Sequence, residues 1–243
     1  MVQSIGFLTW YWEYCEWLPV FRLAFRRPFS HYDPTEIGQF SNIVGRGIAD
    51  YLGRNLSGAI QAHAYEDALK VRKIPYSGPR PDLYCDTGTQ QFSMEAKGLS
   101  AGTVSANAMT GHKAQAKAGP LPVHFAIASV SYNLYRTPSC KYFDPVADRA
   151  DYDGSLAVIL ARLKYISLLS IVDRLPRLRD ASIGNEIVER FRLSTAEDAP
   201  LALLLAKRVR SIVEHPDVAP ARIERIERED EFLDVDGIGL QIA

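Results

Sequence analysis

The sequence predicts an α/β protein whose core, residues 31–135, is a mixed central sheet flanked by helices. Three observations predict this class: a well-marked helix start at residue 33, two short alternating segments within residues 81–97, and a long apolar run at residues 123–134. We expect residues 1–30 to form an aromatic-rich N-terminal extension, as an extra helix on the core or a partner surface. Residues 136–243 are expected to form a mostly helical region packed on the core.

The first core element is a helix that begins at residue 34. Asp33 is a capping residue, Pro34 suits the first helical position, and Glu36 lies where a capping box carries its acid. Apolar residues then recur at helical spacing, so we expect the helix to continue to about residue 55 with one buried face. Residues 56–80 are ambiguous and fit a short strand or a helix.

Two short strands follow, at residues 81–85 and 91–97, joined by a tight turn. The second alternates apolar and polar residues, which places Glu95 and Lys97 on the same side, roughly 6 to 7 Å apart at the backbone. The remaining expected elements are a helix at 103–118, a buried strand at 123–134, helices at 155–172, 185–191 and 200–214, and a strand pair at 232–242.

Composition restricts the function only mildly. The formal net charge of −1 does not indicate a nucleic-acid-binding protein. Residues 70–120, however, hold seven Lys and Arg against three Asp and Glu, and a locally basic field suits a polyanionic substrate. The three cysteines form no C-x-x-C pair, and no uninterrupted apolar run reaches 18 residues. We therefore expect a cytoplasmic protein that has no disulfide framework and makes no membrane contact.

The residues with the most specific chemistry are Pro81-Asp82 and, after a short interval, Glu95-Ala96-Lys97. Two carboxylates are hard oxygen ligands of the kind that Mg²⁺ prefers, and a lysine beside them can orient an attacking water. Next to a metal, a lysine can also have its pKa lowered and then serve as a base. The pattern therefore fits metal-assisted hydrolysis of a phosphodiester, in which negative charge grows on the phosphorus oxygens.

This motif, in its order of helices and strands, resembles the PD-(D/E)XK nuclease superfamily, which has the restriction-endonuclease-like fold. The resemblance covers roughly residues 33–135. It implies that Asp82 and Glu95 bind Mg²⁺, which Mn²⁺ can replace, with the Ala96 carbonyl as a further ligand. It also implies that Lys97 positions and helps to deprotonate the attacking water.

The resemblance implies further residues on the neighbouring helices. Many members add an acid from the preceding helix, where Glu36 is the candidate metal ligand, although its capping-box position explains it equally well. Some members use a Gln or Lys on the helix after the motif, where Lys113 and Gln115 are candidate substrate-binding residues. DNA is the expected partner, together with a second copy of the chain or another protein subunit.

Two alternatives stay open. Asp82 could open a turn and Glu95 with Lys97 could form a solvated strand face, as in a catalytically silent module that binds DNA or a protein. Residues 98–102 also match G-x-S-x-G, which makes Ser100 a candidate serine-hydrolase nucleophile with His215. The candidate acids for that triad are Asp144, Asp148, Asp151 and Asp173. A hydrolase strand should be almost wholly apolar, whereas residues 91–97 carry polar side chains.

Overall fold

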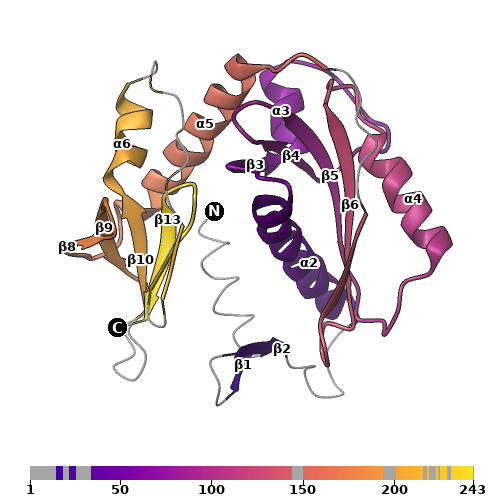
Figure 1. Ribbon diagram of the computed structural model, residues 1–243, viewed down its shortest axis with the longest axis horizontal. Coiled ribbons are helices and arrows are strands. Elements are labelled where there is room, and N and C mark those ends of the chain that lie inside the picture. The colour runs from indigo at the N-terminus through magenta and orange to yellow at the C-terminus, as the bar shows by residue number, and fades with distance from the viewer. Residues whose placement is uncertain are drawn as a thin grey trace. The chain divides into compact units, whose positions relative to one another are not determined.

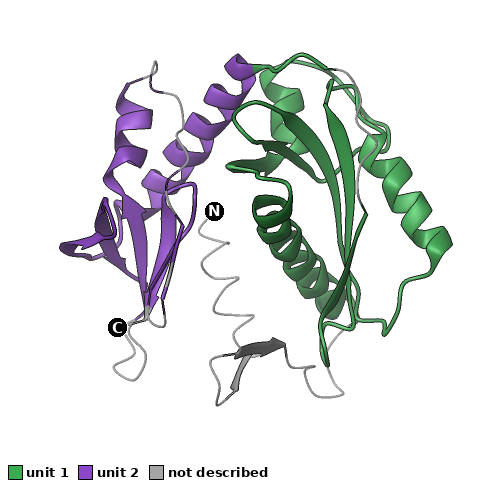
Figure 2. Cartoon of the chain, viewed as in Figure 1, with its two compact units in different colours: residues 1–153 green, residues 154–243 purple. Residues whose placement is uncertain are grey.

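The computed structural model describes residues 34–143, 150–193, 201–215 and parts of 218–242, together with the backbone of two strands near the N-terminus (Figure 1). The chain divides into two compact units, residues 1–153 and 154–243 (Figure 2). The described residues form five helices, a mixed five-stranded sheet, a six-stranded antiparallel sheet and a separate strand pair. The prediction of an α/β protein is therefore confirmed.

The elements of unit 1 follow the predicted order, with additions. They are β1 (Cys15–Leu18), β2 (Arg22–Phe25), α2 (Pro34–Leu56), β3 (Gln61–Ala64), α3 (Tyr65–Val71), β4 (Leu83–Asp86), β5 (Gln91–Gly98), α4 (Ala106–Lys117), β6 (Phe125–Tyr132) and β7 (Ser139–Phe143). The ambiguous interval holds β3 and α3. In the N-terminal extension β1 and β2 pair as antiparallel strands, so these two segments are not helical. The rest of residues 1–30 and the expected cap residue Asp33 lie outside the described residues.

The main sheet has the order β3-β4-β5-β6-β7. β5 and β6 are parallel, and the other neighbours are antiparallel. The parallel pair needs a crossover, which α4 supplies. Because β7 pairs with β6, the sheet extends past the expected core boundary at residue 135, and the second unit begins at Gly154.

Helices cover both faces of this sheet, with α2 on one side and α4 on the other (Figure 1). Alternate residues from Phe92 to Ala96 share a core with Ala49 of α2. On the opposite face the Ser93 hydroxyl donates a hydrogen bond to the Ala116 carbonyl of α4 at 2.6 Å. β5 is consequently buried on both faces, and its odd-numbered side chains face α4.

The contact between α2 and the end of β5 requires glycine on both elements. A Cβ atom on Gly45 would collide with the backbone of Gly98, and a Cβ atom on Gly98 would collide with the Ser41 carbonyl. Backbone therefore contacts backbone at this point, which only residues without a side chain permit.

Unit 2 is built on an antiparallel sheet. Its elements are α5 (Gly154–Val172), β8 (Arg177–Ile183), β9 (Glu186–Arg192), β10 (Leu201–Ala206), α6 (Lys207–Glu214), β11 (Ile226–Glu227), β12 (Glu231–Leu233) and β13 (Ile238–Ile242). The strand order is β11-β12-β13-β10-β9-β8. α5 is apolar enough by length and composition to span a membrane, with a mean hydropathy of 1.8, although it carries Arg162 and Lys164. Its residues Ala161, Tyr165 and Leu169 belong to the core of this unit.

The expectation of a mostly helical C-terminal region is wrong. The segment expected as a helix at 185–191 is strand β9, because Gly184, with φ 56°, turns the chain back in a two-residue hairpin. Residues 201–206 form β10 at the centre of the sheet, and only the second half of the expected helix at 200–214 is helical, as α6. The helix at 155–172 and the terminal strand pair are confirmed.

Candidate functional site

The structure brings together the three residues that the motif singled out. Asp82 immediately precedes β4, and Glu95 and Lys97 lie on the face of β5 that is turned toward α4. The ammonium Nζ of Lys97 is 2.7 Å from Glu95 Oε1 and 3.5 Å from Asp82 Oδ2. One cation therefore lies between two carboxylates.

Glu95 is the least ordinary member of this group because it is 0% exposed. Apart from the ion pair with Lys97, neither of its carboxylate oxygens accepts a well-aligned hydrogen bond from a described residue. Burial raises the pKa of Glu95 to about 7, and the negative charge of Asp82 adds to the rise, while the contact with Lys97 opposes it. A buried carboxylate with so few donors is costly unless a cation or a proton compensates it.

Lys97 is charged at neutral pH. Burial alone would lower its pKa, but its contacts with Glu95 and Asp82 outweigh burial, so the pKa is raised. A lowered pKa, which would allow a basic amine, is expected only next to a bound metal, so that expectation stays a prediction. Lys97 acts here as a counterion and as a hydrogen-bond donor.

The side chain of Asp82 is held in place by the neighbouring strand. Its Oδ2 accepts a hydrogen bond from the Ala96 backbone N–H at 3.0 Å. Its own backbone is fixed as well, because its N–H donates to the Met94 carbonyl and its carbonyl accepts from the Tyr65 N–H. The carboxylate is thus oriented by the sheet before any ligand arrives.

This donor set fits a divalent cation. When both are ionised, Asp82 and Glu95 carry two negative charges against the single positive charge of Lys97, and both carboxylates reach the same ammonium. Mg²⁺ takes one or two carboxylates and completes its shell with water and substrate oxygens. Among the described residues, no group of three or more His, Cys, Asp or Glu is placed to hold a metal ion, so water and substrate oxygens would have to complete the shell around these two carboxylates.

Glu36 does not join this group. It lies ten residues before Arg46 on α2, roughly 15 Å along the helix axis, and Arg46 is the α2 residue that contacts Asp82, donating to its carbonyl at 3.4 Å. We therefore remove Glu36 from the candidate metal ligands.

The two candidate substrate-binding residues of α4 point in different directions. Gln115 donates from Nε2 to the Arg80 carbonyl at 3.1 Å and lines a pocket beside Asp82. Lys113 instead places its ammonium 4.4 Å from the centre of the Phe143 ring and does not line that pocket. Because Lys113 and Gln115 are two residues apart on a helix, their side chains face different sides of it.

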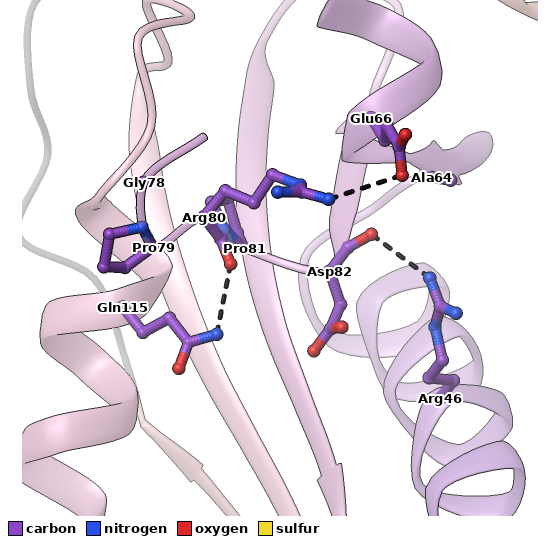
Figure 3. A pocket seen from close by; sticks show the side chains of 9 residues that line it. All are labelled: Arg46, Ala64, Glu66, Gly78, Pro79, Arg80, Pro81, Asp82 and Gln115. Atoms are coloured by element: carbon purple, nitrogen blue, oxygen red, sulfur yellow. Dashed lines mark hydrogen bonds and ion pairs between the residues drawn. The ribbon is translucent and has the colours of Figure 1, made fainter. Parts of the chain in front are cut away.

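The pocket has a volume of about 460 Å³ and opens next to Asp82 (Figure 3). Its walls come from α2 through Arg46, from α3 through Glu66, from the loop before β4 through Arg80, and from α4 through Gln115. Sequence reasoning missed both arginines. The signal available for Arg80 was its position directly before the Pro81-Asp82 pair.

His112 is a further residue that sequence reasoning missed. It lies on α4 one turn before Gln115 and Ala116, so it shares the helix face that meets β5. Burial lowers its pKa, the positive charge of Lys97 lowers it further, and Asp82 opposes both. His112 is therefore within electrostatic reach of the motif.

The serine-hydrolase alternative finds little support in the backbone. A nucleophile elbow places its serine on a strained turn between strand and helix. Only Lys73 and Asn133 have positive φ among the described non-glycine residues, and α4 begins six residues after Ser100. The polar residues of β5 do not exclude such an enzyme, however, because the strand is central and buried despite them. His215 ends α6, and Asp144 and Asp148 lie outside the described residues.

No protein-family model, no curated protein and no solved structure matches this chain. Any functional assignment therefore depends on the residues and contacts of the chain itself.

Proposed function

We propose that this protein is a Mg²⁺-dependent nuclease that hydrolyses phosphodiester bonds of DNA. The observation that carries the proposal is the fully buried carboxylate of Glu95, which forms an ion pair with the ammonium of Lys97 and interacts with a second carboxylate, Asp82. A purely structural role does not need a fully buried acid at the position of Glu95, since replacing a buried ion pair by apolar residues of similar volume is often neutral or stabilising.

The order of elements supports the proposal. The segment α2-β3-α3-β4-β5-α4-β6 has three antiparallel strands, the first two joined through the short helix α3, followed by a helical crossover to a parallel strand. Asp82 stands at the entrance of the second of these antiparallel strands, and Glu95 with Lys97 stands on the third. This arrangement resembles the core of the PD-(D/E)XK nucleases.

Each residue then has a separate task. Asp82 and Glu95 would hold the cation through their carboxylates, and the resemblance implies the Ala96 carbonyl as a further ligand. When bound, Mg²⁺ supplies positive charge where negative charge grows on the phosphorus oxygens. Lys97 donates a hydrogen bond that orients the attacking water, and its contact with Glu95 fixes the ammonium in place.

The test is cleavage of supercoiled plasmid and of single-stranded DNA with Mg²⁺ or Mn²⁺ and with chelator. We expect metal-dependent cleavage by the wild type and a loss of about a hundredfold or more for Asp82→Asn and for Lys97→Ala. Ser100→Ala is the matched control, because its hydroxyl is exposed and lies outside the carboxylate group. Thermal unfolding of each variant checks that the fold is retained.

Three results would overturn the proposal. Binding of DNA by folded wild type without any cleavage would leave a silent binding module. Ester hydrolysis that only Ser100→Ala abolishes would establish the serine hydrolase. Cleavage that persists in Asp82→Asn would place the active centre elsewhere.

A further inference from the structure

The pocket beside Asp82 contains two arginines whose hydrogen-bonding capacity is hardly used. Among the described residues, the side chain of Arg46 donates one hydrogen bond, to the Asp82 carbonyl at 3.4 Å. The side chain of Arg80 likewise donates one to a described residue, Glu66, at 3.4 Å. Both distances are beyond the usual range for N–H···O bonds, and each guanidinium offers five donors.

The acids near these arginines compete only weakly for them. The ion pair between Arg80 and Glu66 is substantially exposed on both sides, so water and salt screen it. The carboxylate of Asp82 points away from the Arg80 guanidinium and interacts with Ala96 and Lys97 instead (Figure 3). Positive charge therefore remains available inside the pocket.

We infer that this pocket binds a phosphate group of the substrate, through Arg46 and Arg80, next to the bond that is cleaved. A guanidinium matches a phosphate with paired hydrogen bonds, which is why arginine is favoured for this ligand. The volume of about 460 Å³ lies in the range of pockets that enclose a small molecule, and Gln115 adds an amide for a neighbouring polar group. This assignment rests on the proposed nuclease function, because the pocket shares Asp82 with the candidate metal site.

The phosphate has two sources, an internal phosphodiester or the phosphate at a strand end. Short single-stranded oligonucleotides with a 5′-phosphate, a 3′-phosphate or hydroxyl groups at both ends distinguish them. Affinity is measured in chelator, so that neither metal nor cleavage contributes. The chain is used at full length, and the variants are Arg46→Gln, Arg80→Gln, Glu66→Gln and Lys117→Gln.

We expect Arg46→Gln and Arg80→Gln to weaken binding by about tenfold or more. Glu66→Gln should tighten binding, because it releases Arg80. Lys117→Gln is the matched control, since Lys117 is an exposed lysine of α4 outside the pocket, and it should change affinity only slightly. If a terminal phosphate is the ligand, its removal weakens binding as much as Arg80→Gln does; if an internal phosphate is the ligand, all oligonucleotides respond alike.

Equal affinities for the arginine variants and Lys117→Gln would overturn the inference, as would weaker binding by Glu66→Gln. The outcome is separable from that of the proposed function. If the wild type cleaves DNA and the arginine variants bind it as tightly as the wild type, the phosphate site is refuted and the nuclease function stands. If binding depends on the arginines but the wild type never cleaves DNA, the nuclease function is refuted and the phosphate site stands.

Discussion

Replacing the Glu95 carboxylate by an amide, Glu95→Gln, should make the metal-free protein more stable at neutral and alkaline pH. The wild-type side chain is fully buried and its pKa is raised by that burial. Glutamine has the same shape as protonated glutamate but cannot ionise. The variant therefore removes the cost of a buried charge while keeping the packing of β5.

The size of the effect follows from the pKa. The carboxyl group titrates near 4.5 when unfolded and near 7 when folded. At about 1.36 kcal/mol per unit of pKa, this difference amounts to about 3 kcal/mol. Because the folded pKa is raised, protonated Glu95 contributes this difference of about 3 kcal/mol to the free energy of unfolding in full below pH 4.5. The wild type loses this contribution as the pH rises through 7. Glu95→Gln keeps this stability, so the two proteins should match in acid, diverge as the pH rises from 4.5 toward 7, and differ by a constant amount above that.

The assay is thermal unfolding of both proteins in chelator, from about pH 4 to about pH 8. Subtracting the two curves cancels the other titrating groups. For a chain of this length, about 3 kcal/mol corresponds to a gain of about 6 to 12 °C for the variant at the alkaline end. Saturating Mg²⁺ should narrow the gap, because it stabilises only the wild type. A variant that is less stable than the wild type at about pH 8, or a difference that does not change with pH, would refute the reasoning.

Three further changes have definite expected outcomes. Gly98→Ala forces a side chain into the backbone of α2 and should cost about 3 kcal/mol or more in the free energy of unfolding; Gly47→Ala, with open space around its Cβ position, should be neutral or stabilising. Equal free energies of unfolding for the two variants in denaturant titrations would contradict this. His112→Gln should weaken DNA binding in chelator only at acidic pH, below the ordinary pKa of 6.5, because the lowered pKa leaves His112 charged only there; an equal loss at all pH values would argue against a titrating role. Tyr65→Phe removes the acceptor of the buried Leu121 N–H and should lower the free energy of unfolding by about 1 to 3 kcal/mol. A much smaller loss of stability would argue against this hydrogen bond.

The fold of unit 1 was largely predictable because its local signals agree with its tertiary contacts. A proline and an acid mark the start of α2, and β5 alternates as a strand should. β3 and α3 were not predictable, since each is short and β3 receives its partner from β4, far along the chain. In unit 2 the spacing of Val188 and Phe191 imitates a helix, although both side chains are buried in a sheet.

The residues of the motif could be predicted from the sequence, whereas the helix residues around them could not. Residues on one strand at a spacing of two share a face, which fixed Glu95 and Lys97. That this face would be closed over by α4, leaving Glu95 without solvent, depends on the crossover and could not be inferred from the motif. Arg46 and His112 come from helices whose rotation about the sheet is set by packing, so a linear pattern does not reveal them.

The glycine contact between α2 and β5 fixes the spacing between the pocket and the two carboxylates. Gly45 immediately precedes Arg46, and Gly98 immediately follows Lys97. Because backbone meets backbone there, no adaptable side chain separates the α2 segment that carries Arg46 from the strand that carries Lys97, and the two residues cannot slide relative to each other. If the protein is the proposed nuclease and the pocket holds the phosphate at a strand end, this fixed spacing would set a constant distance between that end and the bond that is cleaved.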